Sequence, residues 1–462
     1  MDMTSVEQIV RISEAQKKYF RSGVTLDIKF RKQMLQKLLG ALEKWEGRLS
    51  EALWCDLHKS YEEAYLTELS IVKAEVKNHI HHLKKWSRRT KAVSPLKMFP
   101  SQSYVVKEPL GNALIIAPWN YPIQLLINPL VGAISAGCTA MLKPSPYVPN
   151  VSKAIEEMIV DTFDSEYIAV VQGNRDVNTA LLAQRWDVIF FTGSPALAKK
   201  VMAAAAQNLT PVILELGGKS PCIIDKNTEL KTAAKRIAWG KTLNCGQTCI
   251  APDYVLIHKD VKEAFVQAFA KEVKELHGDD VKVSKHYVRM VNDNAFERVS
   301  GYIKESKVLY GGTYDASERY IAPTLLDNPA LDSRVMTEEI FGPVLPVITI
   351  DSDGSFLEKV TDFITSREKP LALYYFGDES EGWKLVRRVS SGGGCINDVV
   401  MHIANEKIPF GGVGNSGMGR YHGKDSFEAF SHIRGIVTTT KWLDLPFRYM
   451  PYKLFGLVKS IL

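Results

Sequence analysis

Apolar side chains recur at helical spacing through the first 90 residues. One such stripe runs through Leu35, Leu38, Leu39 and Leu42, with charged and polar residues around it. Residues three and four apart lie on one face of a helix, so the spacing predicts several amphipathic helices with charged outer faces. The pattern changes over residues 94–109, where three prolines and alternating apolar positions predict an extended arm.

The stretch from Asn112 to Leu142 contains no Asp, Glu, Lys or Arg, and it is long enough to cross a membrane as a helix. Its three prolines and internal asparagines argue against that, because a lipid-embedded helix tolerates such interruptions poorly. A strand over 113–116, a helix over 124–136 and a strand over 139–142 fit better. We therefore predict a βαβ unit with strands buried on both faces.

Strand and helix patterns continue to alternate along the chain, which predicts an α/β protein with doubly wound parallel sheets. The predicted strands lie over 168–171, 188–191, 212–215, 220–224, 254–257, 344–350 and 371–376, and the predicted helices over 151–163, 177–184, 197–206, 230–242 and 261–275. We assign residues 1–211 to N-terminal helices and a dinucleotide-binding lobe, with an arm strand near 100–107. Residues 212–419 form a second, catalytic lobe, and residues 420–462 a return strand and a C-terminal tail.

Composition narrows the function less than the pattern does. A chain of 462 residues is too long to form a single ordinary hydrophobic core, so two or three lobes are expected. Its 58 Lys and Arg residues against 52 Asp and Glu residues leave a net charge of only +6. No basic run is dense enough for a nucleic-acid groove, so we expect no nucleic-acid partner. The six cysteines form no CxxC pair and follow no secretory leader, which predicts reduced thiols, no metal site and a cytoplasmic protein.

The stretch from Leu243 to Asp253 carries the candidate chemistry, Leu-Asn-Cys-Gly-Gln-Thr-Cys-Ile-Ala-Pro-Asp. Cys249 is a candidate nucleophile if an acid–base partner and oxyanion donors lie near it. Glu215 and Asn120 are candidates for those two parts. Each residue alone also has a plainer explanation: a buried apolar thiol, a turn glutamate and a turn asparagine.

Five motifs together resemble the aldehyde dehydrogenase family. They are Asn-x-Gly-Gln-Thr-Cys (244–249), Leu-Glu-Leu-Gly-Gly-Lys (214–219), Pro-Trp-Asn-Tyr-Pro (118–122), Glu-Glu-Ile-Phe-Gly-Pro (338–343) and Pro-Phe-Gly-Gly-Val-Gly-Asn-Ser-Gly (409–417). They occur in the family's order, and the likeness extends from about residue 10 to about residue 440. It is greatest to the class 3 branch, which acts on fatty and aromatic aldehydes. The resemblance implies a Rossmann-type cofactor lobe, a second α/β catalytic lobe and an oligomerisation arm.

By this resemblance, Cys249 attacks an aldehyde and forms a thiohemiacetal, whose oxyanion is held by the Asn120 amide and the Cys249 N–H. Hydride transfer to a nicotinamide gives a thioester, and Glu215 deprotonates the water that hydrolyses it. Lys219 is expected to support this base. Cys245 occupies the variable position of its motif, so it is a second candidate nucleophile and a candidate disulfide partner of Cys249.

The cofactor is expected where a strand runs into a helix at Gly193 and Ser194, because a helix N-terminus offers free N–H groups to a pyrophosphate. The literal Gly-x-Gly-x-x-Gly at 412–417 is rejected for this role, since no βαβ unit follows it. The resemblance assigns that segment to a loop of the catalytic half. It places Glu339 on the nicotinamide ribose and Phe341 against the nicotinamide ring, for which surface charge and core packing are the plainer explanations.

Lys143 ends a predicted strand on the side where open α/β sheets bind ligands, and the resemblance implies that it reaches the adenosine ribose. Many class 3 relatives carry a Glu three residues later, which accepts from the ribose 2′-OH and repels a 2′-phosphate. Pro146 stands at that position here. We therefore expect NAD and NADP both to be used, unless Pro146 only stiffens a turn.

Tyr65, Trp119 and Tyr121 are candidates for an apolar pocket that suits medium- or long-chain aliphatic and aromatic aldehydes, although core packing explains these aromatic residues as well. The resemblance implies a homodimer, with residues 101–107 and 437–441 as edge strands for subunit contact. The aromatic and basic tail 446–462 is expected to close the pocket mouth, pair with a partner subunit or lie on a membrane surface.

Two other functions remain alternatives at this point. The first is an enzyme of similar fold that releases the acyl group to coenzyme A, against which the hydrolytic base Glu215 argues. The second is a non-enzymatic member of the fold, which would be expected to lack the thiol, the base or Asn120.

Overall fold

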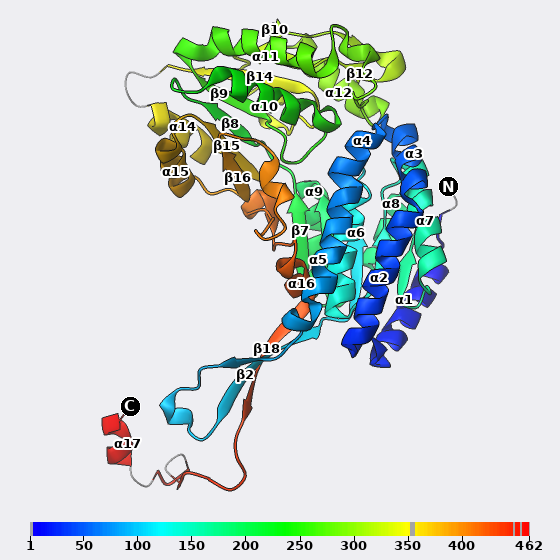
Figure 1. Cartoon of the computed structure of the whole chain (residues 1–462), viewed down its shortest axis with the longest axis vertical. Helices are drawn as coiled ribbons and strands as arrows, with labels where there is room; N and C mark the ends of the chain where they lie inside the picture. Colours follow the sequence, from blue (N-terminus) through cyan, green and yellow to red (C-terminus); the bar gives the residue numbers. More distant parts are fainter. Residues whose placement is uncertain (1–2, 352–355, 447–448, 453–454, 462) are drawn as a thin grey trace.

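The computed structural model describes residues 3–351, 356–446, 449–452 and 455–461. Figure 1 shows two helix-covered sheets, one above the other along the long axis, and a β-arm that projects from the lower end. The C-terminal helix α17 (Phe455–Ile461) lies beyond the tip of this arm, far from the N-terminus. Within the described ranges, no helix is both long and apolar enough to span a bilayer.

The N-terminal helices cover both faces of the first sheet. They are α1 (Val6–Arg21), α2 (Ile28–Lys44), α3 (Glu46–Leu57), α4 (Tyr61–Ala64), the π-turn η2 (Tyr65–Leu69) and α5 (Ser70–Trp86). Helix α1 begins with a capping box, in which Ser5 Oγ accepts from the Gln8 N–H at 3.2 Å. It packs on one face through Ile9. Helix α2 packs on the other face through the predicted leucine stripe, beside α5, which contributes Val72 and Val76.

The first sheet has the strand order β17-β7-β6-β3-β4-β5, and all of its pairs are parallel except β17 with β7. Its strands are β3 (Asn112–Ile116), β4 (Thr139–Lys143), β5 (Ile168–Val170), β6 (Val188–Gly193), β7 (Val212–Leu216) and β17 (Gly417–Met418). Its helices are α6 (Gln124–Ala136), α7 (Pro149–Thr162), α8 (Arg175–Leu182) and α9 (Pro195–Ala206). The uncharged stretch is therefore β3-α6-β4, buried throughout, as the βαβ prediction required.

Two boundaries of the predicted lobes need correction. The first lobe does not end at residue 211, because β7 pairs with β6 and extends the first sheet to Leu216. The motif 409–417 is also not only a loop of the catalytic half. Its last residue, Gly417, begins β17, which pairs with Glu215 and Leu214 of β7 and so returns the chain to the cofactor sheet.

The second sheet has the order β10-β13-β14-β9-β8-β15-β16. Its strands are β8 (Pro221–Ile224), β9 (Tyr254–His258), β10 (Val308–Tyr310), β13 (Thr324–Asp327), β14 (Val344–Ile350), β15 (Ala372–Phe376) and β16 (Gly393–Ile396), beside a small hairpin of β11 (Tyr314–Asp315) and β12 (Tyr320–Ile321). Its helices are α10 (Leu230–Thr242), α11 (Lys262–His277), α12 (Asp293–Lys304), α13 (Arg334–Thr337), α14 (Phe356–Thr365) and α15 (Glu379–Arg388).

The arm is a three-stranded sheet made from distant parts of the chain, β1 (Thr90–Ala92), β2 (Gln102–Pro109) and β18 (Ser431–Thr438). Helix α16 (Lys424–Ala429) leads into β18, which runs antiparallel to β2 over its whole length. The prediction that 101–107 is an edge strand was wrong, because β2 lies between β1 and β18. Strands β1 and β18 form the two edges of this sheet, and the residues of β18 are almost all exposed. In the tail, Phe447, Arg448, Lys453 and Leu454 lie outside the described residues.

Candidate active site

A cavity of about 270 Å³ lies between the two sheets. It is bounded by the carboxyl ends of β6 and β7 on one side and by residues just before β9, β14 and β15 on the other. Eight of the predicted site residues line it: Cys249, Glu215, Asn120, Gly193, Ser194, Glu339, Phe341 and Trp119. The fold therefore brings together residues that are separated by up to 222 positions in the chain, from Trp119 to Phe341.

Cys249, the predicted nucleophile, follows a tightly wound loop. Asn244, Cys245 and Gly246 have positive φ angles of 50°, 55° and 69° in succession. A Cβ atom on Gly246 would lie 2.3 Å from the carbonyl oxygen of Gly342, so only glycine fits there. The loop leaves Cys249 half-buried at the cavity wall.

Cys245 points away from this cavity. Its Sγ lies 3.7 Å from the Tyr287 hydroxyl and 3.9 Å from Met290 Sδ, and its side chain is fully buried. The geometry thus favours Cys249 over Cys245 as the thiol that meets a substrate. Burial raises the pKa of the Cys249 thiol to about 12, and the nearby Glu339 and Glu215 carboxyls add to this effect.

Asn120 is buried beside the nucleophile loop. The side-chain Nδ2 of Asn120 donates to the backbone carbonyl oxygen of Gln247 at 3.0 Å. The backbone carbonyl oxygen of Asn120 accepts from Asn244 Nδ2 at 2.9 Å. A side-chain amide has two N–H donors, so one of them is free to meet an oxyanion in the cavity. The arrangement matches the donor role predicted for Asn120.

Glu215 is buried at the wall of the cavity. Neither of its carboxyl oxygens has a hydrogen-bond partner in the described structure, and burial raises its pKa well above the ordinary value. Two other buried polar atoms that line the cavity, Thr192 Oγ1 and the Tyr421 hydroxyl, are also unpaired. Buried polar groups normally have partners, so these orphaned atoms indicate a site built for a polar guest.

The cofactor side of the cavity begins where β6 meets α9. Ser194 is the N-cap residue of this 12-residue helix and makes no side-chain capping hydrogen bond. The first-turn N–H groups are therefore open to an anion such as a pyrophosphate. Ala198, which stands where the family usually has a second glycine, is buried against the first sheet. The residues present fit a dinucleotide.

Glu339 and Phe341 reach the cavity from the loop before β14. Burial, followed by the charge of Asp253, raises the pKa of Glu339 to about 8. Phe341 packs edge-on against Trp119 with ring centroids 5.4 Å apart. Arg298, which the sequence reasoning missed, lines the cavity and donates to the carbonyl oxygens of Glu339 and Ile340 at 3.1 and 2.9 Å.

Lys143 does not line the cavity. It ends β4 and is buried, and its Nζ donates to the carbonyl oxygen of Pro144 at 2.7 Å. Burial lowers the pKa of this ammonium to about 8. Pro146 is exposed three residues later, on the same side of the sheet as Ser194.

Two predicted pocket residues lie elsewhere. Tyr65 is on the surface, where its ring packs beside Tyr61 with centroids 6.1 Å apart. Tyr121 is buried behind the cavity wall, and its hydroxyl lies 2.7 Å from Thr248 Oγ1. Both are excluded from the cavity lining because the helical turn and the strand-to-helix loop that carry them aim their rings away from it.

Lys219 does not support Glu215, contrary to the prediction. Its Nζ pairs with Asp253 and donates to the carbonyl oxygens of Val335 and Glu338 at 2.8 and 2.9 Å. It therefore stabilises the segment that presents Glu339.

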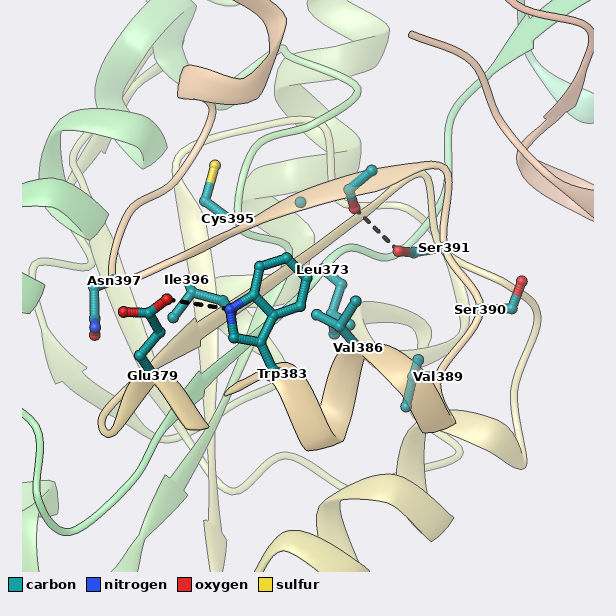
Figure 2. A pocket seen from close by; sticks show the side chains of 12 residues that line it. Leu373, Glu379, Trp383, Val386, Val389, Ser390, Ser391, Cys395, Ile396 and Asn397 are labelled. Carbon is teal, nitrogen blue, oxygen red and sulfur yellow. Dashed lines mark hydrogen bonds between the residues drawn. The ribbon is translucent and has the colours of Figure 1, made fainter. Parts of the chain in front are cut away.

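A larger hollow, of about 720 Å³, lies outside the active cavity, between α15 and the edge strand β16 (Figure 2). Trp383 crosses it and donates through Nε1 to Glu379 Oε1 at 3.2 Å. None of Cys249, Glu215 and Asn120 lines it. Among the residues that the structure describes, no group of His, Cys, Asp and Glu is arranged to hold a metal ion.

Comparison with known proteins identifies the relatives of this chain. Residues 1–436 match the aldehyde dehydrogenase family. The chain is 45% identical to a 4,4′-diaponeurosporen-aldehyde dehydrogenase of Staphylococcus aureus, over 98% of this chain and 97% of that protein. It is 43% identical to a dimeric NADP-preferring aldehyde dehydrogenase of Canis lupus familiaris, over 97% and 98% of the two chains. A substrate-bound structure of Staphylococcus aureus AldH superposes with a TM-score of 0.95 at 44% identity, covering 99% of this chain and 100% of that one.

Alkylation of Cys249 is expected to accelerate with pH, because a pKa raised to about 12 keeps the thiolate a minor species over the accessible range. The rate with iodoacetamide should rise about tenfold per unit from about pH 7 to about pH 10. Mass spectrometry of the fragmented 242–258 peptide follows it, and Cys245→Ser is the control that should leave the profile unchanged. A plateau below about pH 9 would contradict the raised pKa.

Proposed function

Because the chain belongs to the aldehyde dehydrogenase family, we propose that it oxidises medium- or long-chain aliphatic and aromatic aldehydes to carboxylic acids with NAD or NADP. Its membership makes it an NAD(P)-dependent oxidoreductase, and the family predicted from the motifs is confirmed. The observation that carries the detailed proposal is the meeting of Cys249, Asn120 and Glu215 in one desolvated cavity.

Cys249 is the nucleophile of this proposal. Its thiolate adds to the aldehyde carbonyl, a C–S bond forms, and the carbonyl electron pair becomes an alkoxide. The free N–H of the Asn120 amide and the Cys249 backbone N–H stabilise that alkoxide, because fixed dipoles in a dry cavity need little reorganisation. When bound along Gly193, Ser194 and Glu339, NAD or NADP supplies the hydride acceptor that converts the adduct to a thioester.

Glu215 is the base for hydrolysis of the thioester. Its raised pKa makes its carboxylate a stronger proton acceptor than an exposed glutamate, so it can deprotonate a water molecule next to the acyl group. The hydroxide adds to the thioester carbonyl, the C–S bond breaks, and the acid leaves. An enzyme that passes the acyl group to coenzyme A has no need of such a base, so we place this chain with the hydrolytic enzymes.

We propose that both cofactors are accepted. Pro146 carries no charge to repel a 2′-phosphate, and Lys143 ends β4, the strand that leads to Pro146. A relative with 43% identity is named for its preference for NADP, which agrees with this proposal.

The substrate class is proposed from the lining of the cavity and from the relatives. Trp119, Leu125 and Phe410 contribute apolar side chains to the lining of the cavity. A relative at 45% identity is named as a 4,4′-diaponeurosporen-aldehyde dehydrogenase, which agrees with an aldehyde substrate.

The assembly proposed is a homodimer formed through the arm, with residues 420–462 supplying the oligomerisation strand and the tail. The unpaired edge of β18 presents Ile433, Ile436 and Val437 to solvent, 39 to 52% exposed. An exposed strand edge of this length pairs readily with a second chain. One relative is named as dimeric.

The tail is proposed to rest on a membrane surface. Trp442, Met450 and Phe455 are 84, 79 and 65% exposed, and Lys441 and Lys459 flank them with positive charge. Aromatic and basic residues together favour the headgroup region of anionic lipids. We place the protein itself in the cytoplasm, because all six cysteines are free thiols, as a reducing compartment keeps them.

Initial rates of reduced-cofactor formation with decanal and with benzaldehyde test the thiol and the cofactor proposals. Wild type should turn over with both NAD and NADP, and Cys249→Ala should lose activity by about a thousandfold or more. Activity confined to NAD would reject the argument from Pro146. Full activity of Cys249→Ala would make Cys245 the next candidate.

Glu215→Gln should show a rapid burst of reduced cofactor and then a steady rate about a hundredfold or more below wild type, because only hydrolysis needs the base. In wild type, the steady rate should rise with pH, since a raised pKa leaves Glu215 protonated until the pH approaches it. The variant should lose that dependence. Recovery of its steady rate on addition of coenzyme A would favour the acyl-transferring alternative.

Arm and tail should be separable by mutation. Sedimentation velocity should show a dimer for wild type and a monomer for Ile436→Asp, because a charge at a strand edge opposes pairing. A chain that ends at residue 440 should stay dimeric but no longer pellet with vesicles containing phosphatidylserine. A truncated chain that becomes monomeric would instead assign the tail to the partner subunit.

A further inference from the structure

An ion pair lies buried behind the wall of the active cavity. Lys59 Nζ and Glu68 Oε1 are 2.7 Å apart, and both side chains are 0% exposed. A buried pair rarely recovers its desolvation cost through its own attraction, so its other hydrogen bonds indicate what it is for. Here those bonds all go to residues 120–124, the loop that carries Asn120 and the start of α6.

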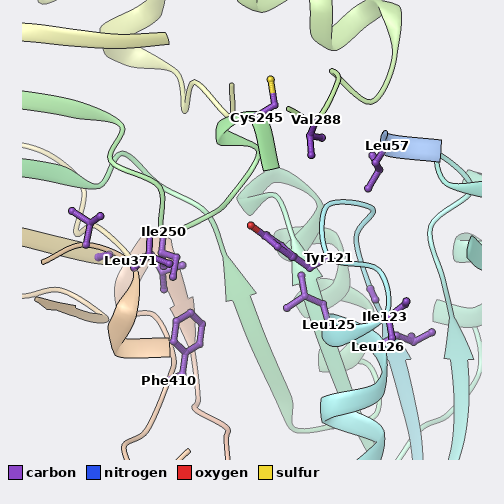
Figure 3. Close-up of a cluster of buried hydrophobic side chains, with 14 of the residues drawn as sticks. Leu57, Tyr121, Ile123, Leu125, Leu126, Cys245, Ile250, Val288, Leu371 and Phe410 are labelled. Atoms are coloured by element: carbon purple, nitrogen blue, oxygen red, sulfur yellow. The ribbon is translucent and has the colours of Figure 1, made fainter. Parts of the chain in front are cut away.

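Lys59 holds the Asn120 end of this loop. Its Nζ donates to the Asn120 carbonyl oxygen at 3.2 Å and lies 4.3 Å from the centroid of the Tyr121 ring. Figure 3 shows Tyr121 between helix α6 and the loop that carries Cys245 and Ile250, and its hydroxyl meets Thr248 beside the nucleophile. One ammonium therefore contacts two consecutive residues, and both of them touch the catalytic loop.

Glu68 holds the other end. Its Oε2 accepts from the backbone N–H groups of Ile123 at 2.8 Å and Gln124 at 3.3 Å. Helix α6 has no side-chain cap of its own, so this carboxylate serves as the anion at its N-terminus. Glu68 lies in the π-turn 65–69, a departure from regular helix that turns it into the core, and such turns are frequent at functional sites.

The same helical segment also contacts the catalytic loop directly. Glu63 Oε1 accepts from the backbone N–H of Asn244 at 2.9 Å, at the first of the three left-handed residues. Asn244 and Asn120 both donate to the Gln247 carbonyl oxygen at 3.0 Å. The Asn120 amide is thus fixed between the segment 59–68 on one side and the catalytic loop on the other.

We propose that the Lys59–Glu68 pair is a positioning device for the oxyanion donor. It holds the backbone of residues 120–124 so that the free N–H of the Asn120 amide faces the carbonyl oxygen of the aldehyde that Cys249 attacks. Neither residue lines the cavity, so both act through Asn120 and touch neither substrate nor cofactor. The inference rests on the role proposed above for Asn120. A displacement of about 1 Å in such a donor is enough to lower a rate by about a hundredfold.

The double variant Lys59→Met/Glu68→Met tests this inference, because it removes both charges together and leaves neither unpaired in the core. We expect a folded protein whose kcat for decanal is about ten- to a hundredfold lower, with KM for NAD and for decanal within about twofold of wild type. Glu68→Gln, which keeps the side-chain shape, should show a smaller loss of kcat in the same direction. A folded double variant with wild-type kcat would overturn the proposal.

Combination with Asn120→Ala separates positioning from a general effect on packing. If the pair acts through Asn120, the double substitution should lower kcat less than about twofold in the Asn120→Ala background, because its target is already gone. An equal loss in both backgrounds would overturn the proposal. The half-buried pair Lys262 and Asp327, 2.5 Å apart in the second lobe, is the control, and Lys262→Met/Asp327→Leu should leave kcat unchanged. A wild-type rate for Asn120→Ala alone would instead reject the proposed role of Asn120.

Discussion

Desolvation of the polar groups that line a small cavity is the physical condition on which the proposed chemistry of this enzyme depends. The cavity of about 270 Å³ holds a carboxyl group with no hydrogen-bond partner, and burial disfavours its charged form. In bulk water the same glutamate would be a weak base, and the thiol nearby would gain nothing from fixed dipoles. Desolvation therefore increases both the basicity of Glu215 and the value of each oriented N–H group.

Residues from several directions enclose this cavity, because the fold places two sheets end to end with the cavity between them. The carboxyl ends of β6 and β7 supply Gly193, Ser194 and the proposed base Glu215, while the loops before β9 and β14 supply the proposed nucleophile Cys249 and Glu339. Strand β17 ties the halves together by returning from the second lobe to pair with β7 beside Glu215. The N-terminal segment 59–68 then contacts both loops from behind.

The sequence was sufficient to predict what repeats locally or matches a contiguous motif. The uncharged βαβ unit and most helices of the first lobe were predicted in that way. Contiguous motifs also singled out Cys249, Glu215 and Asn120, which the structure brings to one cavity. The sequence was insufficient where tertiary partners decide the outcome. Strand β7 has the same pattern in either lobe, and only its pairing with β6 assigns it to the first.

Side-chain direction was equally hidden from the sequence. Nothing in the sequence around an aromatic residue such as Tyr65 shows that its ring faces solvent. Arg298 and Tyr421 line the cavity, but one lies on an ordinary amphipathic helix and the other in a glycine-rich loop. Only the meeting of their elements gives them a place in the site. The Lys219 ammonium likewise pairs with Asp253, 34 residues away, and not with Glu215, four residues before it.

The pairing of β2 with β18 and of β7 with β17 also has a consequence for biosynthesis. Strands β17 and β18 lie near the end of the chain, so a ribosome completes more than 400 residues before either pair can form. Until then the edges of β2 and β7 stay open while the interior of the first lobe is already assembled, and open edges pair readily with other chains. A message truncated before β17 would therefore yield a lobe with an exposed edge beside Glu215 rather than a smaller functional enzyme. Activity and protection from aggregation become available together, late in synthesis.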